Sequence, residues 1–169
     1  MNAAATSDLS RLRAGERPAD RDATWRAAVA QALLADLRPG DHALAVWLLE
    51  GEIAALRQSG AGDLETLYRL IAAVARFARP DDALLIWRAS QATPEARLGV
   101  DVEQALRAGP EAVTRTLQRL KAGSDSQGED AAAALAWVEA GIAGGAASDL
   151  PAYFAWSDER FGLHISGPT

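Results

Sequence analysis

The spacing of apolar residues along the chain predicts helices from one end to the other. Trp25, Val29, Leu33 and Leu37 recur every four residues, as on one face of an α-helix that starts near residue 20. No stretch alternates between apolar and polar residues at the period of two that is typical of a half-buried strand. The helices expected from such spacing cover residues 20–37, 41–58, 63–78, 81–87, 93–109, 110–122, 129–142 and 150–161. The sequence therefore predicts an all-α protein with about eight helices stacked as antiparallel hairpins, either α-solenoid-like or as a compact bundle.

Acidic residues mark the expected helix starts. Asp41, Asp63 and Asp81 each precede an apolar stripe. In that position a carboxylate can accept hydrogen bonds from the unpaired amide groups of the first turn. Thr93 followed by Pro94 marks another start, because a capping hydroxyl is followed by a proline at the first helical position.

A seven-residue pattern occurs twice, forty residues apart. Asp41–Trp47 and Asp81–Trp87 each begin with an aspartate and place a tryptophan six residues later. At this period the chain resembles the HEAT-like α-helical hairpin repeats over residues 38–108. It lacks the 34-residue spacing of tetratricopeptide repeats. The resemblance implies stacked hairpins with a ridge or groove suited to binding. Coincidence in a chain rich in Ala and Leu is the alternative.

Length and composition favour one globular domain. The chain has 169 residues, of which 49% are hydrophobic and 24% charged. We expect a flexible N-terminal tail over residues 1–19, a single helical domain over 20–161 and a C-terminal tail over 162–169. Neither a signal peptide nor an apolar run approaching the length of a membrane span is recognisable. A cytoplasmic location is therefore expected.

The negative charge is concentrated near the C-terminus. Residues 1–122 contain 16 acidic and 16 basic side chains, whereas residues 123–169 contain seven acidic side chains and one arginine. The net charge of −6 thus belongs to the last 47 residues. Such asymmetry can mark a surface for a basic partner, and a solvated acidic face is the alternative.

The sequence contains few candidate catalytic residues. The chain has no cysteine and two histidines, His42 and His164, neither of which has a second ligand at helical spacing. Carboxylate pairs such as Glu50 and Glu52 point in different directions on a helix, so they do not converge as an acid and a base. No glycine-rich phosphate loop is present. We predict no catalytic residue, no cofactor and no metal site, and hence a protein that is not an enzyme. An enzyme of undetected type stays open.

Residues 102–123 resemble a bacterial helix-turn-helix. The segment has a first helix, a turn at Gly109 and the sequence Val113-Thr114-Arg115 at the start of a second helix. The turn is about two residues shorter than in that family. The resemblance implies phosphate contacts from the basic residues Arg107, Arg115, Arg119 and Lys121. Because the chain is acidic, duplex DNA is expected to bind weakly, and a DNA-binding regulator is kept as an alternative.

Aromatic residues indicate where a partner would bind. Trp25, Trp47, Trp87 and Trp137 lie on or near apolar stripes and are expected in the core, whereas Trp156, beside Tyr153 and Phe154, is expected to be an exposed anchor. The predicted partner-binding surface combines these aromatic residues with acidic ones: Trp156, Tyr153, Glu139, Asp149, Asp158 and Glu159. We therefore expect a protein-binding module, of the acidic inhibitor, immunity or adaptor type, for a basic protein partner. A homo-oligomer is left open.

Overall fold

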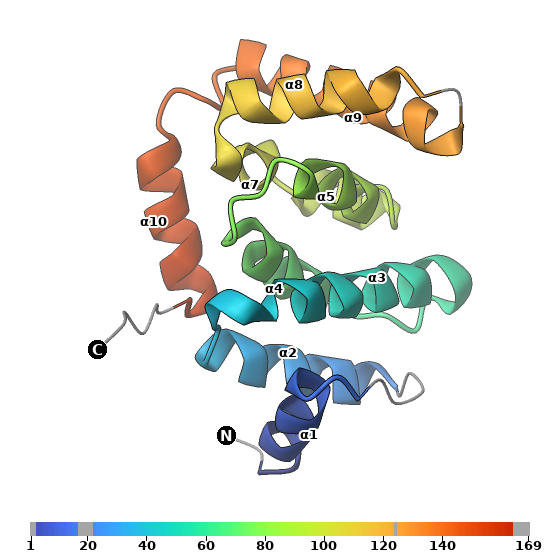
Figure 1. Ribbon diagram of the computed structural model, residues 1–169, viewed down its shortest axis with the longest axis vertical. Helices are drawn as coiled ribbons and strands as arrows, with labels where there is room; N and C mark the ends of the chain where they lie inside the picture. Colours follow the sequence, from blue (N-terminus) through green and yellow to red (C-terminus); the bar gives the residue numbers. More distant parts are fainter. Residues whose placement is uncertain (1–2, 17–21, 124, 164–169) are drawn as a thin grey trace. The chain divides into compact units, whose positions relative to one another are not determined.

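The computed structural model describes residues 3–16, 22–123 and 125–163, and over these ranges it contains helices and no strand (Figure 1). The predicted all-α class is confirmed. The α-helices are α1 (Ala3–Arg13), α2 (Ala23–Ala35), α3 (His42–Ser59), α4 (Leu64–Ala75), α5 (Asp82–Ser90), α6 (Pro94–Gly99), α7 (Val102–Ala105), α8 (Pro110–Lys121), α9 (Ser126–Ala143) and α10 (Leu150–Phe161). Two 3₁₀ turns, η1 (Pro39–Asp41) and η2 (Leu106–Ala108), precede α3 and α8.

The chain divides into two compact units. The first unit comprises the residues up to Val74 together with those from Asp158 onward, and the second comprises Ala75–Ser157. Helix α10 contributes to both units. The single domain expected over 20–161 stays a prediction.

Helix α1 occupies a segment that was expected to be a flexible tail, so that expectation is wrong for residues 3–13. Leu9 and Leu12 are buried, and α1 packs against α2. Arg13 joins the end of α1 to the turn before α3: its Nε and Nη2 atoms donate to the Asp41 carboxylate over 2.9 and 2.6 Å. This helix was not predicted because two leucines three residues apart are too few to indicate an apolar helix face.

Helices α2 and α4 begin where the sequence places them. The Asp22 carboxylate accepts a hydrogen bond from the amide of Trp25 over 2.9 Å and so caps α2. The Asp63 carboxylate accepts from both the amide and the hydroxyl of Thr66, over 2.8 and 2.6 Å, and caps α4 as predicted. These caps pair amide groups that a helix start leaves without intrahelical partners.

The aspartates of the repeated pattern do not cap their helices, which corrects the prediction for Asp41 and Asp81. Asp41 is buried and accepts from Arg13 and from the amide of Arg38, the latter over 3.0 Å. Asp81 is exposed and accepts from Arg119 over 3.1 Å. Both residues still precede a helix, and the HEAT-like resemblance stays a prediction.

The second unit contains a break where one long helix was expected over 93–109. Thr93 caps the start as predicted, accepting from the amide of Ala96 over 3.1 Å. Val100 and Asp101 are extended, with ψ angles of 112° and 135°, so the segment divides into α6, α7 and η2. The break buries Val100 and leaves the Leu98 side chain 90% exposed. Leu98 therefore does not belong to the core stripe, and Gly99 and Val100, both weak helix formers, lie at the break.

Helices α8 and α9 pack along each other, and the loop between them is shorter than expected. Helix α9 starts at Ser126 instead of residue 129, because the Asp125 carboxylate caps it by accepting from the amide of Gly128 over 3.0 Å. A Cβ atom at Gly128 would lie 2.0 Å from the carbonyl oxygen of Gly123. This close approach requires a glycine at position 128.

Residues 162 and 163, the first two of the predicted C-terminal tail, are described by the structure. Gly162 has a φ angle of +66°, and the amide of Leu163 donates to the carbonyl of Asp158 over 2.8 Å. Leu163 is buried. The tail expectation is wrong for these two residues, and residues 164–169, including His164, lie outside the described part of the chain.

Candidate functional site

Three aromatic side chains form a cluster on α10, here called the α10 aromatic group: Tyr153, Phe154 and Trp156. The ring centroid of Tyr153 lies 5.6 Å from that of Trp156 and 5.8 Å from that of Phe154. Trp156 is 46% exposed, as predicted for an anchor residue. The spacing of three residues places Tyr153 and Trp156 next to each other on the helix surface.

Hydrogen bonds hold Tyr153 in place. Its phenol donates to Asp101 over 2.9 Å and accepts from the Gln104 amide over 3.2 Å. The same amide donates to Ser157 over 2.7 Å, and both Gln104 and Ser157 are buried. Burial, followed by the negative charge of Asp101, raises the pKa of the Tyr153 phenol, which therefore stays protonated as a donor at neutral pH.

Arg107 contributes a cation to this group. Its guanidinium carbon lies 4.7 Å from the centroid of the Phe154 ring, a distance typical of a cation–π interaction. The other arginines of the helix-turn-helix hypothesis are also engaged: Arg115 pairs with Glu111 at 3.6 Å and Arg119 with Asp81 at 3.1 Å. The first helix of that predicted motif, α7, is only four residues long.

Of the four predicted carboxylates, three lie on or next to α10 and one lies on α9. Glu159 follows Trp156 by three residues on α10 and projects from the same side, whereas Asp158 follows by two and projects from another side. Asp149 caps α10, with its carboxylate 3.4 Å from the amide of Ala152. Glu139 is exposed on a different helix, α9. The exposed Trp156 ring agrees with the prediction, and the partner-binding surface as a whole stays a prediction.

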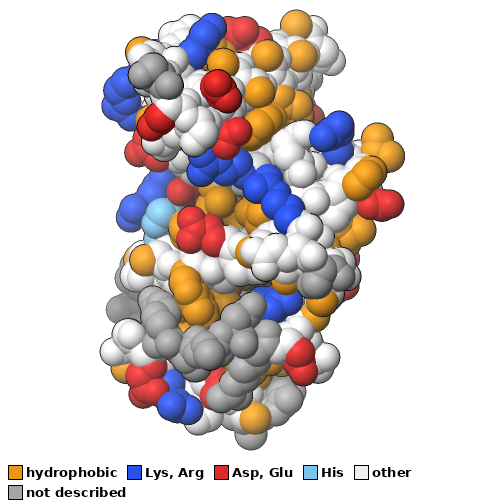
Figure 2. Space-filling model, turned by 90° about the vertical axis from the view of Figure 1, so that its right-hand side faces the viewer, with side chains coloured by type: hydrophobic (Ala, Val, Ile, Leu, Met, Phe, Trp, Pro, Cys, Tyr) orange, Lys and Arg blue, Asp and Glu red, His pale blue; other side chains and the backbone are white. Residues whose placement is uncertain are grey.

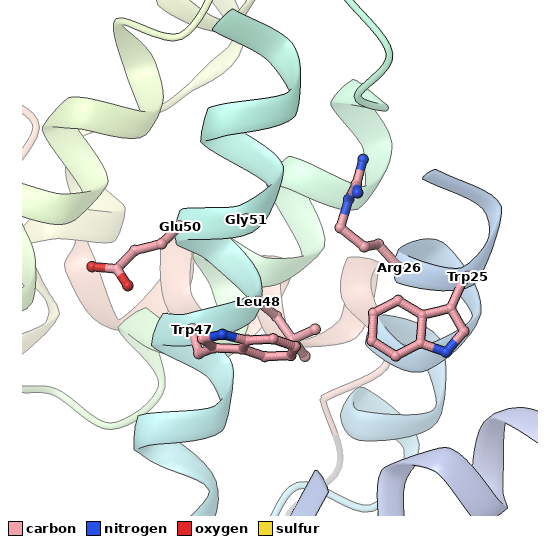
Figure 3. Close-up of a pocket in the computed structure, with 6 residues that line it drawn as sticks. All are labelled: Trp25, Arg26, Trp47, Leu48, Glu50 and Gly51. Carbon is pink, nitrogen blue, oxygen red and sulfur yellow. The ribbon is translucent and has the colours of Figure 1, made fainter. Parts of the chain in front are cut away.

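A second candidate site lies in the first unit, between α2 and α3. Six residues line a hollow of about 230 Å³, here called the two-tryptophan hollow (Figure 3): Trp25, Arg26, Trp47, Leu48, Glu50 and Gly51. The indole centroids of Trp25 and Trp47 lie 6.5 Å apart, with the rings at 80° to each other. Both rings were expected in the core, and both are half-buried.

A hydrogen bond links Trp25 to α1. Its indole Nε1–H donates to the Asp8 carboxylate over 2.8 Å. This hydrogen bond fixes the orientation of one wall of the hollow. Sequence reasoning missed the contact because it treated α1 as a tail.

A buried ion pair supports the hollow. The Arg26 Nε atom donates to the Glu52 carboxylate over 2.6 Å, and Glu52, fully buried, also accepts from the amide of Asp63. The expected divergence of Glu50 and Glu52 is real: Glu52 points into the core, whereas Glu50 is exposed and points to the side of α3 away from Trp25 (Figure 3). A signal for this pair was present in the sequence, since Arg26 precedes Val29 by three residues and so shares its buried face.

Two further observations on the described residues concern metal ions and membrane-spanning helices. Over residues 3–16, 22–123 and 125–163, no three His, Cys, Asp or Glu side chains come close enough together to hold a metal ion. His42, the first residue of α3, is half-buried. In the same ranges no helix combines the length and apolar character needed to cross a bilayer.

The two sites share one geometric feature. Both place tryptophan rings on helices with part of each ring exposed to solvent. Comparison with protein-family models, with curated proteins and with solved structures finds no match to this chain.

Proposed function

We propose that this protein is a non-enzymatic protein-binding module that contacts a basic partner through the α10 aromatic group. The observation that carries the proposal is the half-exposed Trp156 ring, packed against a Tyr153 ring that hydrogen bonds hold in place. Tryptophan is enriched among residues that dominate binding energy. A ring that is already ordered loses little conformational entropy when a partner covers it, which favours affinity.

The charge distribution supports a basic partner. The net charge of −6 comes from residues 123–169, and Glu159 projects from the same side of α10 as Trp156. Figure 2 shows a face on which Lys and Arg side chains lie among Asp and Glu side chains. Exposed carboxylates mainly accelerate encounter with a partner of opposite charge. An inhibitor, immunity or adaptor protein in the cytoplasm is the proposed setting, with HEAT-like hairpins over 38–108 as its proposed architecture.

Affinity capture with matched variants tests the proposal. Wild-type protein and the Trp156→Ala variant are immobilised, and captured proteins are quantified by mass spectrometry. We expect a basic protein whose dissociation constant rises about 30-fold or more in the variant, because tryptophan anchors contribute about 2 kcal/mol or more. Leu98→Ala removes another exposed apolar side chain and is expected to leave capture unchanged.

A matched pair of variants tests the contribution of the acidic side chains to binding. Glu159→Lys is expected to slow association with the captured partner, whereas Asp158→Lys, on another side of α10, is expected to slow it less. Capture that is insensitive to Trp156→Ala would refute the proposed surface. Capture of nucleic acid in place of protein would favour the DNA-binding alternative.

A further inference from the structure

We infer that the two-tryptophan hollow is a second binding site, which receives an arginine side chain of the basic partner. The hollow has a volume of about 230 Å³ and two indole rings in its walls. Small-molecule pockets usually measure roughly 300–1,000 Å³. The hollow is therefore suited to one long side chain and is too small for a cofactor.

The chemistry of the walls favours a cation with an apolar stem. Tryptophan rings attract guanidinium and ammonium groups, and arginine is found on them more often than lysine. Leu48 and the indoles offer apolar surface for the methylene groups of the stem. Glu50 is exposed on the Trp47 side of the hollow, and its carboxylate points away from Trp25 (Figure 3). Within the described part of the chain this carboxylate makes no ion pair, so it is available to a guanidinium head group on that side.

The resident cation of the hollow does not oppose this occupant. Arg26 lines the hollow, but its charge is balanced by Glu52 at 2.6 Å, and both side chains are buried. The formal charges of Arg26, Glu52 and Glu50 sum to −1. An incoming guanidinium therefore meets a site of opposite sign.

Gly51 keeps one wall of the hollow open. It lies in the middle of the 18-residue helix α3, where glycine is a poor helix former. A Cβ atom at this position would meet only the Arg26 Cδ atom, at 4.0 Å, which is an ordinary contact. Packing requires a glycine at position 128, where a Cβ would lie 2.0 Å from a carbonyl oxygen, but it does not require one at position 51. The absent side chain at Gly51 instead leaves space in the hollow.

This inference takes one element from the proposed function, namely that the partner is basic. The hollow and the α10 aromatic group share no residue. Loss of one site therefore leaves the other measurable, and the two proposals can fail separately.

Nuclear magnetic resonance of the full chain tests the inference through the indole N–H signals of its five tryptophans. The signals are assigned with single Trp→Phe variants, and the protein is titrated with an eight-residue peptide of alternating Gly and Arg. We expect saturable shifts of the Trp25 and Trp47 signals. The same peptide with citrulline, the neutral analogue of arginine, is expected to produce none. Unmoved Trp25 and Trp47 signals, or equal shifts with citrulline, would overturn the inference.

Three variants locate the site. Gly51→Met fills the hollow and is expected to abolish the saturable shifts, with a thermal unfolding midpoint no lower than that of wild type. Glu50→Gln is expected to weaken binding about two- to fivefold, as for an exposed charge pair. Trp156→Ala is expected to leave the titration unchanged, which separates this site from the α10 aromatic group.

Each outcome bears on the inference. Wild-type affinity in a folded Gly51→Met variant would overturn it, as would loss of the Trp25 and Trp47 shifts in Trp156→Ala. If Gly51→Met fails to fold, the inference is tested with Gly51→Ala, Glu50→Gln and the citrulline peptide. The two variants introduce no large side chain, and the peptide experiment uses the wild-type protein.

Discussion

The two copies of the repeated pattern, Asp41–Trp47 in the first unit and Asp81–Trp87 in the second, start helices with different surroundings. Leu44 and Leu84 hold equivalent positions, and each is 4% exposed. The aspartates differ, since Asp41 is buried against Arg13 whereas Asp81 is exposed beside Arg119.

The helices that follow also differ in length. Helix α3 continues for 18 residues, past Gly51, whereas α5 ends after nine at Ser90. A shared pattern thus sets where a helix starts and which leucine is buried. The partners of the polar side chains depend on elements elsewhere in the chain.

The largest expected effect tests what the two copies share. Leu44→Ala and Leu84→Ala each remove a buried side chain and are expected to lower the free energy of unfolding by about 2–5 kcal/mol. Urea unfolding followed by circular dichroism measures both. Leu98→Ala, at an exposed leucine, is the control and is expected to change stability by less than about 0.5 kcal/mol. A loss of about 2–5 kcal/mol at one position and below about 0.5 kcal/mol at the other would break the equivalence of the two copies.

The next effect tests how the copies differ. Asp41→Ala leaves Arg13, 16% exposed, without its closest carboxylate and is expected to lower the free energy of unfolding by about 3 kcal/mol. Asp81→Ala removes an exposed pair and is expected to change it by less than about 1 kcal/mol. Equal losses in the two variants, measured by the same urea titration, would mean that burial does not distinguish these aspartates.

The smallest effect concerns an aspartate that does cap its helix. Hydrogen bonds from Thr66, the side-chain hydroxyl first, hold the pKa of Asp63 below its usual range. The ionised carboxylate therefore stabilises the fold above the unfolded-state pKa of about 3.9, and this stability is lost as the pH falls through the lower folded-state pKa. Asp63→Ala is expected to lower the free energy of unfolding by about 1 kcal/mol at pH 7.

A matched variant separates the cap from its charge. Asp63→Asn keeps an acceptor for the amide of Thr66 but does not titrate. Its unfolding free energy is expected to depend less on pH between 2 and 5 than that of wild type. An unchanged pH dependence would show that Asp63 does not contribute to acid unfolding.

Much of the secondary structure could be predicted because helix signals are local. Thr93-Pro94 and Asp63 mark helix starts through hydrogen bonds that span three residues. Helix α1 escaped prediction because its stability depends on packing against α2 and on Arg13 reaching Asp41, which are not local features. The break at Val100 was also not predicted. The break allows the Val100 side chain to be buried, and this burial depends on residues outside the helical stripe.

The candidate sites were only partly predictable. The exposed Trp156 followed from an aromatic residue beside polar ones near the end of the chain. The hollow between α2 and α3 could not be foreseen, because Trp25 and Trp47 lie on stripes that also suit a core. Helix spacing could have separated Asp158 from Trp156, since residues two apart project from different sides.

The sequence by itself determined the all-α class, most helix boundaries and the burial of most leucines on the apolar stripes, with Leu98 as an exception. These follow from hydrogen bonds within a helical turn and from the helical period, both of which act over a few residues. Only the tertiary structure decided that Glu52 is buried with Arg26, that Asp41 binds Arg13 and that two tryptophans border a hollow. Those outcomes join residues more than 20 positions apart. Their free energies depend on burial and on partner geometry, which helical periodicity does not encode.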